Sequence, residues 1–142
     1  IAEMSVEDFY EKKGHEFRRS WNIAPEPLNK NNPYHPLNIK AYKNIPKNMI
    51  PDTESLKDTY ERVTRYFESE MKKKLENKNI LISAHGNSLR ALCKKIFNLN
   101  NDKISSLEIP TGNPLIIEID TTLKITKCEY LDKKTAKSLV AF

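Results

Sequence analysis

The sequence predicts an α/β fold in three layers, with helices flanking a mainly parallel sheet that has one antiparallel strand. Residues 54–76 carry apolar side chains at three- and four-residue steps, which is the period of an amphipathic helix. Residues 80–84 form a short, continuous apolar run, which is typical of a buried parallel strand. The segments 115–119 and 125–131 are the remaining predicted strands.

The N-terminal part is predicted to hold one helical region and one long loop. We expect helix over residues 2–20, divided into two shorter helices at Gly14. Residues 22–52 hold six of the eight prolines, and we expect an ordered loop over the surface. Parts of the loop are expected to pack onto the protein through its apolar side chains, which are Tyr34, Ile39, Tyr42, Ile45 and Ile50. Asp52 or Thr53 is the expected N-cap of the helix over residues 54–76.

The C-terminal part is predicted to alternate helices, turns and strands. Ser88 can cap a helix whose apolar face carries Leu89, Leu92, Cys93, Ile96 and Phe97. We expect a short helix over 101–107 capped by Asn101, a turn at 110–114 and a link near 120–124 between two strands. A helical tail is expected over 133–142.

Composition excludes several classes of protein. The 142 residues fit one domain, and 24 Lys and Arg against 19 Asp and Glu give a net charge of +5. The lysines are scattered, which favours a solvated surface over a nucleic-acid-binding groove. The apolar runs are far shorter than the ~18 residues of a transmembrane helix. Two cysteines are too few for a disulfide scaffold, so a reducing compartment is expected.

The segment 83–90 is the place where chemistry is expected. In open α/β sheets, ligands bind beyond the carboxyl ends of strands, where helix N-termini direct N–H donors at the ligand. His85 would emerge at that end, Gly86 would let the backbone approach a ligand, and Asn87 would supply an amide. These groups could together form a pocket for a phosphate or a carboxylate.

The residues alone leave several roles open. His85 is either structural or catalytic, and Arg90 either faces the site or packs its stem against the sheet. Arg18 and Arg19 are either a paired clamp for an anion or a solvated helix end. Ser88 suits a cap better than a nucleophile, and Cys93 suits the core. The spacing of the histidines and cysteines does not match that of metal ligands, so no metal site is expected.

Five stretches of the chain resemble the cofactor-dependent phosphoglycerate mutases of the histidine phosphatase superfamily. The most specific are Ala-His-Gly-Asn-Ser-Leu-Arg-Ala-Leu at 84–92 and Ile-Pro-Thr-Gly-Asn-Pro-Leu at 109–115. Phe-Arg-Arg-Ser at 17–20, Asn-Pro-Tyr at 32–34 and Thr-Glu-Ser-Leu-Lys-Asp-Thr at 53–59 resemble other segments of that family in the same order.

The resemblance implies an α/β enzyme that interconverts 3-phosphoglycerate and 2-phosphoglycerate through a phosphohistidine. It implies priming by 2,3-bisphosphoglycerate, no metal, a cytoplasmic location and a homodimer or homotetramer, without a nucleic-acid or membrane partner. His85 would stabilise charge on the transferring phosphoryl group. Gly86 and Asn87 would contact substrate, and Arg18 and Arg19 would bind its phosphate and carboxylate.

Two motifs of the family do not occur in this sequence. Its phosphate-accepting histidine lies in Arg-His-Gly-Glu, and its proton-shuttling glutamate lies in Glu-Arg-His-Tyr-Gly. We therefore expect residues 1–142 to be the C-terminal part of one phosphoglycerate mutase-like domain, unable to form the phosphoenzyme alone. The alternatives are a histidine-type phosphomonoesterase and a non-catalytic basic module that binds anions or nucleic acid.

Overall fold

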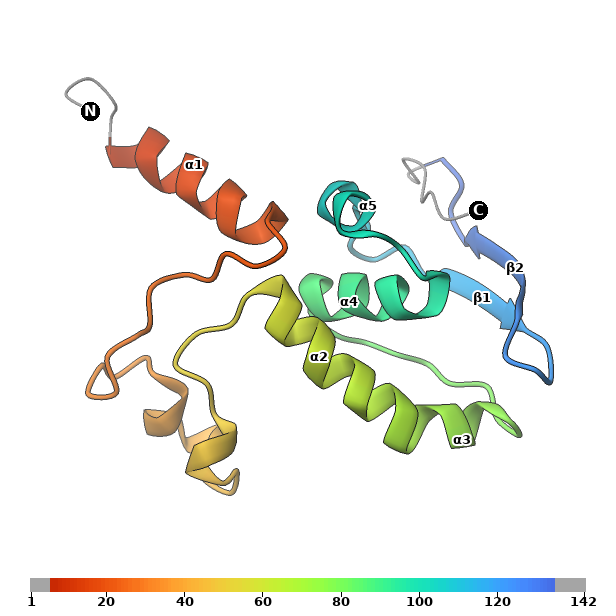
Figure 1. Cartoon of the computed structure of the whole chain (residues 1–142), viewed down its shortest axis with the longest axis horizontal. Helices are drawn as coiled ribbons and strands as arrows, with labels where there is room; N and C mark the ends of the chain where they lie inside the picture. The colour runs from red at the N-terminus through yellow and green to blue at the C-terminus, as the bar shows by residue number, and fades with distance from the viewer. Residues whose placement is uncertain (1–5, 135–142) are drawn as a thin grey trace. The chain divides into compact units, whose positions relative to one another are not determined.

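The computed structural model describes residues 6–134, as helices and one small sheet (Figure 1). The expectation of a mixed helix-and-sheet chain is confirmed. The chain divides into two compact units, Ile1–Thr59 and Tyr60–Phe142. The expected tail helix over 133–142 falls almost wholly on residues outside the described part. No helix in the described part is both long and apolar enough to cross a membrane.

Helix α1 spans Val6–Arg19 without interruption. The expected division at Gly14 is wrong, because a single glycine costs a helix interior only about 1 kcal/mol and does not by itself end the helix. The chain then forms an irregular stretch with three short 3₁₀ turns, Pro36–Asn38, Lys40–Tyr42 and Lys47–Met49. The prediction of a long ordered loop between two helices is confirmed.

One buried histidine ties this loop together. The His35 side chain is completely buried, and its Nε2 lies 3.1 Å from Oδ1 of Asp52 near the loop's other end. Its Nδ1 accepts a hydrogen bond of 3.1 Å from the backbone N–H of Leu37. A backbone hydrogen bond of 3.1 Å from the Leu28 N–H to the Asp52 carbonyl joins the beginning of the loop to its end. Polar contacts therefore anchor the loop.

The apolar side chains of the loop do not pack down as expected. Tyr34 is 81% exposed, and Ile39, Tyr42 and Ile45 are also exposed. Ile50 is half-buried. The loop's prolines and asparagines favour short turns, and the observed turns leave the apolar side chains between them outside a core.

The helix expected over residues 54–76 is present and packs as its pattern indicates. It consists of α2 (Leu56–Tyr66), a π turn (Phe67–Met71) and α3 (Lys72–Leu75). In the second unit, Phe67 and Met71 are buried against Leu92, and Val63, Leu75 and Ile96 pack around them. This cluster attaches the end of the helix to the next helix of the chain.

The N-cap of α2 is Ser55, not Asp52 or Thr53. The Ser55 hydroxyl donates to the Asp58 carboxylate over 2.6 Å and accepts from the Asp58 N–H over 3.2 Å. The Ser55 N–H also donates to that carboxylate, over 2.8 Å. These reciprocal bonds form a capping box, with Asp in place of the usual Glu or Gln. Thr53 instead donates to the Pro25 carbonyl, and Asp52 contacts His35.

Helices α4 (Gly86–Phe97) and α5 (Asn101–Ser106) follow. The N-cap of α4 is His85 rather than Ser88, and the N-cap of α5 is Asn100 rather than Asn101. Asn98 ends α4 with a left-handed backbone, at a φ of 50°, which asparagine tolerates better than most residues. Cys93 is buried with Leu99 and Leu107 in a second cluster, onto which Leu115 of the first strand packs.

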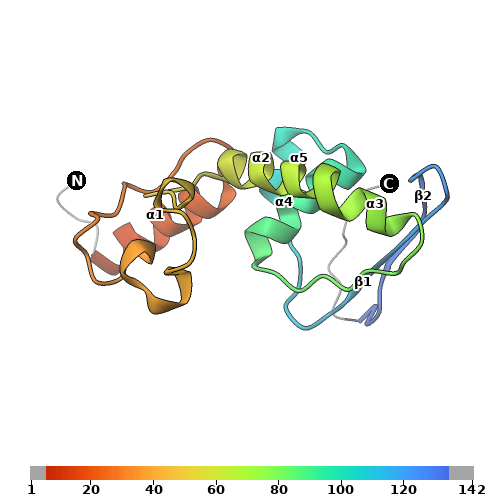
Figure 2. The ribbon, with the colours of Figure 1, turned by 90° about the horizontal axis from the view of Figure 1, so that it is seen from below.

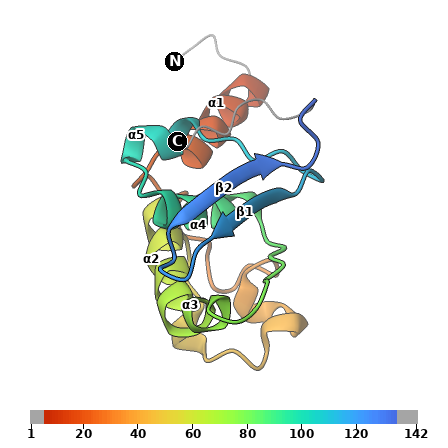
Figure 3. The ribbon, with the colours of Figure 1, turned by 90° about the vertical axis from the view of Figure 1, so that its right-hand side faces the viewer.

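The sheet of the described part is an antiparallel pair, β1 (Leu115–Ile119) and β2 (Ile125–Tyr130). Leu115 lies opposite Tyr130 and Ile117 lies opposite Cys128, with an irregularity in register between Glu118 and Ile119. Seen from the side in Figure 3, the two strands cross in front of α4. Both strands and the link at 120–124 are where the sequence predicts them.

The expected buried strand over 80–84 is not formed. This segment is extended but makes no ladder in the described part of the chain, so the parallel portion of the predicted sheet is absent there. Leu81 is 93% exposed and Ile82 is 39% exposed. Figure 2 shows the segment passing below α4 in that view, and α5 lies above the helix. An apolar run becomes a central strand only where other strands lie on both sides of it.

Replacing the cap of α2 tests the local account of this fold. Ser55→Ala removes the hydroxyl of the capping box, and we expect the free energy of unfolding to fall by about 1 kcal/mol, the usual loss for an N-cap. Urea denaturation measures it, with Ser69→Ala on the exposed surface as the matched control. Equal stability of the two variants would contradict the cap.

The same variant has a defined pH dependence. The Ser55 hydroxyl is the largest cause of the lowered pKa of Asp58. A lowered folded pKa adds stability above the ordinary pKa of the carboxyl group, and this stability is lost as the pH falls through the folded value. The difference between Ser55→Ala and the unchanged chain should therefore shrink in acid.

Candidate active site

His85 stands where the extended segment turns into helix α4. Its backbone is extended, with φ −63° and ψ 145°, while the next residue already begins the helix. The ring Nδ1 accepts a hydrogen bond of 3.4 Å from the backbone N–H of Asn87. The backbone carbonyl of His85 accepts from the Leu89 N–H over 3.1 Å, as an N-cap carbonyl should. The helix start therefore positions the imidazole.

This contact decides which ring nitrogen of neutral His85 can donate. Because Nδ1 accepts the Asn87 N–H, the neutral ring carries its proton on Nε2. The His85 residue is exposed, so the ring is accessible to a ligand. A proton on Nε2 is suited to donate to an oxygen of an anion, and the positive end of the α4 dipole favours negative charge nearby.

Gly86 and Asn87 form the first turn of α4 beside His85. Gly86 is exposed, and a Cβ atom built on it would meet no atom of another group within 4 Å. Open space therefore adjoins the helix start. Asn87 is half-buried, and its side-chain oxygen accepts a hydrogen bond of 3.2 Å from the Arg90 guanidinium. The structure brings His85, Gly86 and Asn87 together at one helix end.

Arg90, whose orientation the residues alone leave open, reaches Asn87 at the start of α4 with one terminal nitrogen and α5 with the other. Its guanidinium donates to the Ile104 carbonyl over 2.5 Å and to the Ser105 carbonyl over 3.3 Å, both near the end of α5. It is therefore buried between α4 and α5, with one arm on Asn87. A three-residue spacing between Asn87 and Arg90 on a helix is a signal for this contact, because such residues are neighbours on the helix surface.

The loop before β1 lies in the same unit and is held by Asn113. Its side-chain nitrogen donates to the Asp132 carbonyl over 2.7 Å, and its oxygen accepts from the Asp132 N–H over 2.9 Å. Gly112 has a φ of +77°, a conformation that side chains disfavour. The predicted turn at 110–114 is thus confirmed, whereas the two hydrogen bonds between Asn113 and Asp132 are not a feature that the sequence predicts.

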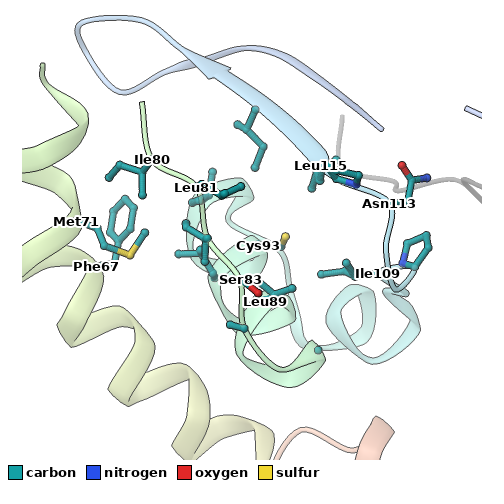
Figure 4. A pocket seen from close by; sticks show the side chains of 18 of the residues that line it. Phe67, Met71, Ile80, Leu81, Ser83, Leu89, Cys93, Ile109, Asn113 and Leu115 are labelled. Carbon is teal, nitrogen blue, oxygen red and sulfur yellow. The ribbon is translucent and has the colours of Figure 1, made fainter. Parts of the chain in front are cut away.

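An apolar groove of about 550 Å³ runs beside α4. Figure 4 shows Phe67, Met71 and Ile80 at one end and Leu115 and Ile109 at the other. The extended segment 80–84, α4, the loop 109–114 and β1 all contribute to its lining. The groove therefore separates the segment that precedes His85 from the nearest strand of the sheet.

Cys93 and Ser88, the other candidate nucleophiles in the sequence, occupy structural positions in α4. Cys93 is buried as expected, and burial raises the pKa of its thiol to about 12, which makes it a poor nucleophile. Ser88 is half-buried in the first turn of α4 and is not its cap. No cluster of three or more metal-ligating side chains occurs within the part of the chain that the structure describes.

Arg18 and Arg19 are the last two residues of α1 and belong to the first unit. Arg19 is half-buried. His85, Gly86 and Asn87 belong to the second unit. The predicted site residues thus form two groups, and the arginine pair remains a sequence-based prediction.

The chain is similar to known proteins along most of its length. The family model of the histidine phosphatase superfamily (branch 1) matches residues 19–128. A phosphoglycerate mutase of Pelagibacter ubique, named as 2,3-bisphosphoglycerate-dependent, is 63% identical over 93% of this chain and 56% of the relative. Relatives of the same name from Maricaulis maris and Borreliella burgdorferi are 40% and 45% identical, over 87% and 81% of this chain and 51% and 47% of the relatives. The chain spans about half the length of these curated relatives.

The family match covers the segments that carry the site geometry. It includes Arg19, the whole of α4 with its His85 cap, and both the turn at 110–114 and β1. The extent of this match, together with the similarity of the curated relatives, shows the family: the chain belongs to the histidine phosphatase superfamily (branch 1).

Proposed function

We propose that this chain is part of a phosphoglycerate mutase that interconverts 3-phosphoglycerate and 2-phosphoglycerate through a phosphohistidine. The observation that carries the proposal is the α4 start, where His85, Gly86 and Asn87 stand together beside open space. The printed names of the relatives support the same reaction and the use of 2,3-bisphosphoglycerate as cofactor. The resemblance supports a cytoplasmic homodimer or homotetramer that needs no metal.

The proposed role of His85 is to stabilise the transferring phosphoryl group. In phosphoryl transfer, charge spreads over the equatorial oxygens, and the protein mainly positions groups and neutralises this charge. A proton donor at Nε2, the Asn87 amide and the helix dipole would all act on those oxygens. Groups fixed by the fold before substrate arrives need little reorganisation during the reaction.

Arg18 and Arg19 are proposed to bind the phosphate and carboxylate of the substrate. A guanidinium presents parallel N–H donors that match two oxygens of either group. Both arginines lie at the C-terminal end of α1, directly before the long loop.

The proposed reaction also needs the family's phosphate-accepting histidine, and the Arg-His-Gly-Glu motif that carries it does not occur in this sequence. The apolar groove and the unpaired segment 80–84 support the same proposal, since further strands would cover exposed Leu81 and Ile82. We therefore propose that turnover needs the remaining half of the relatives' length.

The superfamily name makes hydrolysis of phosphomonoesters the second candidate function. Mutase and phosphatase share the phosphohistidine and differ in how water is kept from it. Comparing transfer to phosphoglycerate with release of inorganic phosphate separates the two. A nucleic-acid titration at low salt tests the basic-module alternative, which predicts tight, salt-sensitive binding.

A chimera tests the role of His85. The segment of the Pelagibacter ubique relative that precedes the match is joined to this chain, and phosphoglycerate interconversion is followed by ³¹P NMR. We expect turnover from the chimera and none from the 142 residues alone. His85→Ala in the chimera should lower kcat by about 100- to 1,000-fold, the usual effect of losing one preorganised donor.

The matched control is His15→Ala, which removes an exposed histidine on α1. It should leave kcat unchanged. Near-normal turnover of the His85 variant would remove that residue from the mechanism, and turnover by the isolated chain would refute the need for the remaining half.

The arginine pair predicts a different kinetic signature. Arg18→Ala or Arg19→Ala in the chimera should raise KM for 3-phosphoglycerate roughly 10- to 100-fold, because a hydrogen bond between charged groups contributes about 1.5–3 kcal/mol. Steady-state kinetics with Arg65→Ala, on the exposed side of α2, provide the control. A KM equal to that of the control would show that the pair does not bind substrate.

A further inference from the structure

The second unit holds a buried guanidinium that reaches the proposed site. Arg90 is only 6% exposed, although it lies one turn from the open start of α4. One of its terminal nitrogens donates to two backbone carbonyls, those of Ile104 and Ser105. The other donates to the side-chain oxygen of Asn87 over 3.2 Å. Arg90 therefore links the end of α5 to a proposed substrate contact.

The chemistry of the guanidinium fixes the orientation of the Asn87 amide. A guanidinium carries five N–H donors and no acceptor, so only the oxygen of the amide can bind it. With Oδ1 of Asn87 held by Arg90, the amide nitrogen is the group left for a ligand. That nitrogen is a donor, which suits a phosphoryl oxygen and does not suit a ligand that offers only N–H or O–H groups.

The fold holds Arg90 without help from a ligand. Ile104 is completely buried, and its carbonyl lies 2.5 Å from the guanidinium. Carbonyls near a helix C-terminus carry partial negative charge, which favours a cation there. Because moving Arg90 away would leave its buried charge without these acceptors, its position is strongly determined.

We propose that Arg90 is a positioning residue, which acts through Asn87 by turning the amide so that its NH₂ group faces the phosphoryl oxygens of the substrate. The inference rests on the proposed function and deepens it, since it concerns the same anion site. Arg90 itself stays buried. Its effect on the anion is transmitted through one hydrogen bond, and the orientation of Asn87 exists before any ligand binds.

The orientation is tested first without a ligand. In Arg90→Met, the stem is kept and all donors are lost, so the Asn87 side-chain amide should become free to rotate about its side-chain bonds. The two side-chain NH₂ signals of Asn87 in a ¹⁵N-resolved NMR spectrum should then move to the positions of a flexible amide, with a reduced heteronuclear NOE.

Lys94→Met is the matched control for this measurement. Lys94 is 8% exposed on the same helix, and its ammonium group donates to the Leu99 carbonyl over 2.5 Å. Its loss also removes a buried cation from α4, so general loosening of the helix would affect both variants. We expect the Asn87 amide signals to stay in place in Lys94→Met. Unchanged signals in Arg90→Met would overturn the proposal.

Arg90→Lys provides a second variant in case Arg90→Met fails to fold. It keeps the buried charge and can satisfy an α5 carbonyl, but an ammonium group has no planar fork to serve Asn87 at the same time. The same change in the Asn87 signals is expected. A rigid Asn87 amide in Arg90→Lys would count against the need for the guanidinium.

A titration with inorganic phosphate tests the link to the anion. Asn87→Ala should weaken phosphate binding about three- to tenfold, as expected for one hydrogen bond. Arg90→Met should weaken it by the same factor, and the double variant should show no further loss, because Arg90 acts only through Asn87. Losses that multiply in the double variant would overturn the proposal.

The two readouts separate this inference from the proposed function. If Asn87→Ala binds phosphate normally, Asn87 is not an anion contact and that part of the proposed function fails. The amide signals would still decide whether Arg90 sets the orientation of Asn87. If the signals change as expected but the losses multiply, the proposed site stands and the route through Asn87 is wrong.

Discussion

The buried guanidinium of Arg90 constrains much of the second unit. A charge removed from water is costly unless its donors find acceptors, so α5 must end where its carbonyls reach α4. The bonds to Ile104 and Ser105 give one terminal nitrogen its acceptors, and the bond to Asn87 serves the other. The other faces of α4 meet two apolar clusters, one with Phe67 and Met71 and one with Leu99 and Leu107. The start of α4, where the proposed site lies, is consequently fixed by contacts made along the whole helix.

Local patterns in the sequence predict most helices and both strands. The apolar period of α2 and α3, the composition of β1 and β2, and the change from extended chain to helix at His85 all depend on near neighbours. The state of the segment 80–84 cannot be predicted from near neighbours. Its apolar run has the composition of a central strand, but a strand forms only by pairing with distant chain, and Leu81 remains 93% exposed here.

The choice among neighbouring polar side chains could not be predicted either. Thr53 and Ser55 both suit an N-cap, as do His85 and Ser88 to different degrees, and only the backbone geometry selects one. The Arg90–Asn87 contact has a helical spacing that the sequence displays, whereas the bond from Arg90 to Ile104 joins residues 14 positions apart. The contact between His35 and Asp52 could not be predicted for the same reason, since the two residues are 17 positions apart.

The central claim is that the start of α4 binds a phosphoryl group, with the scattered lysines serving as solvated surface. Mapping of backbone amide shifts by ¹⁵N NMR during a titration with inorganic phosphate tests it most directly. We expect the largest shifts to fall on the first turn of α4, from Gly86 to Leu89, and to saturate together. Small shifts spread over the lysine-rich surface, with none concentrated at that turn, would contradict it.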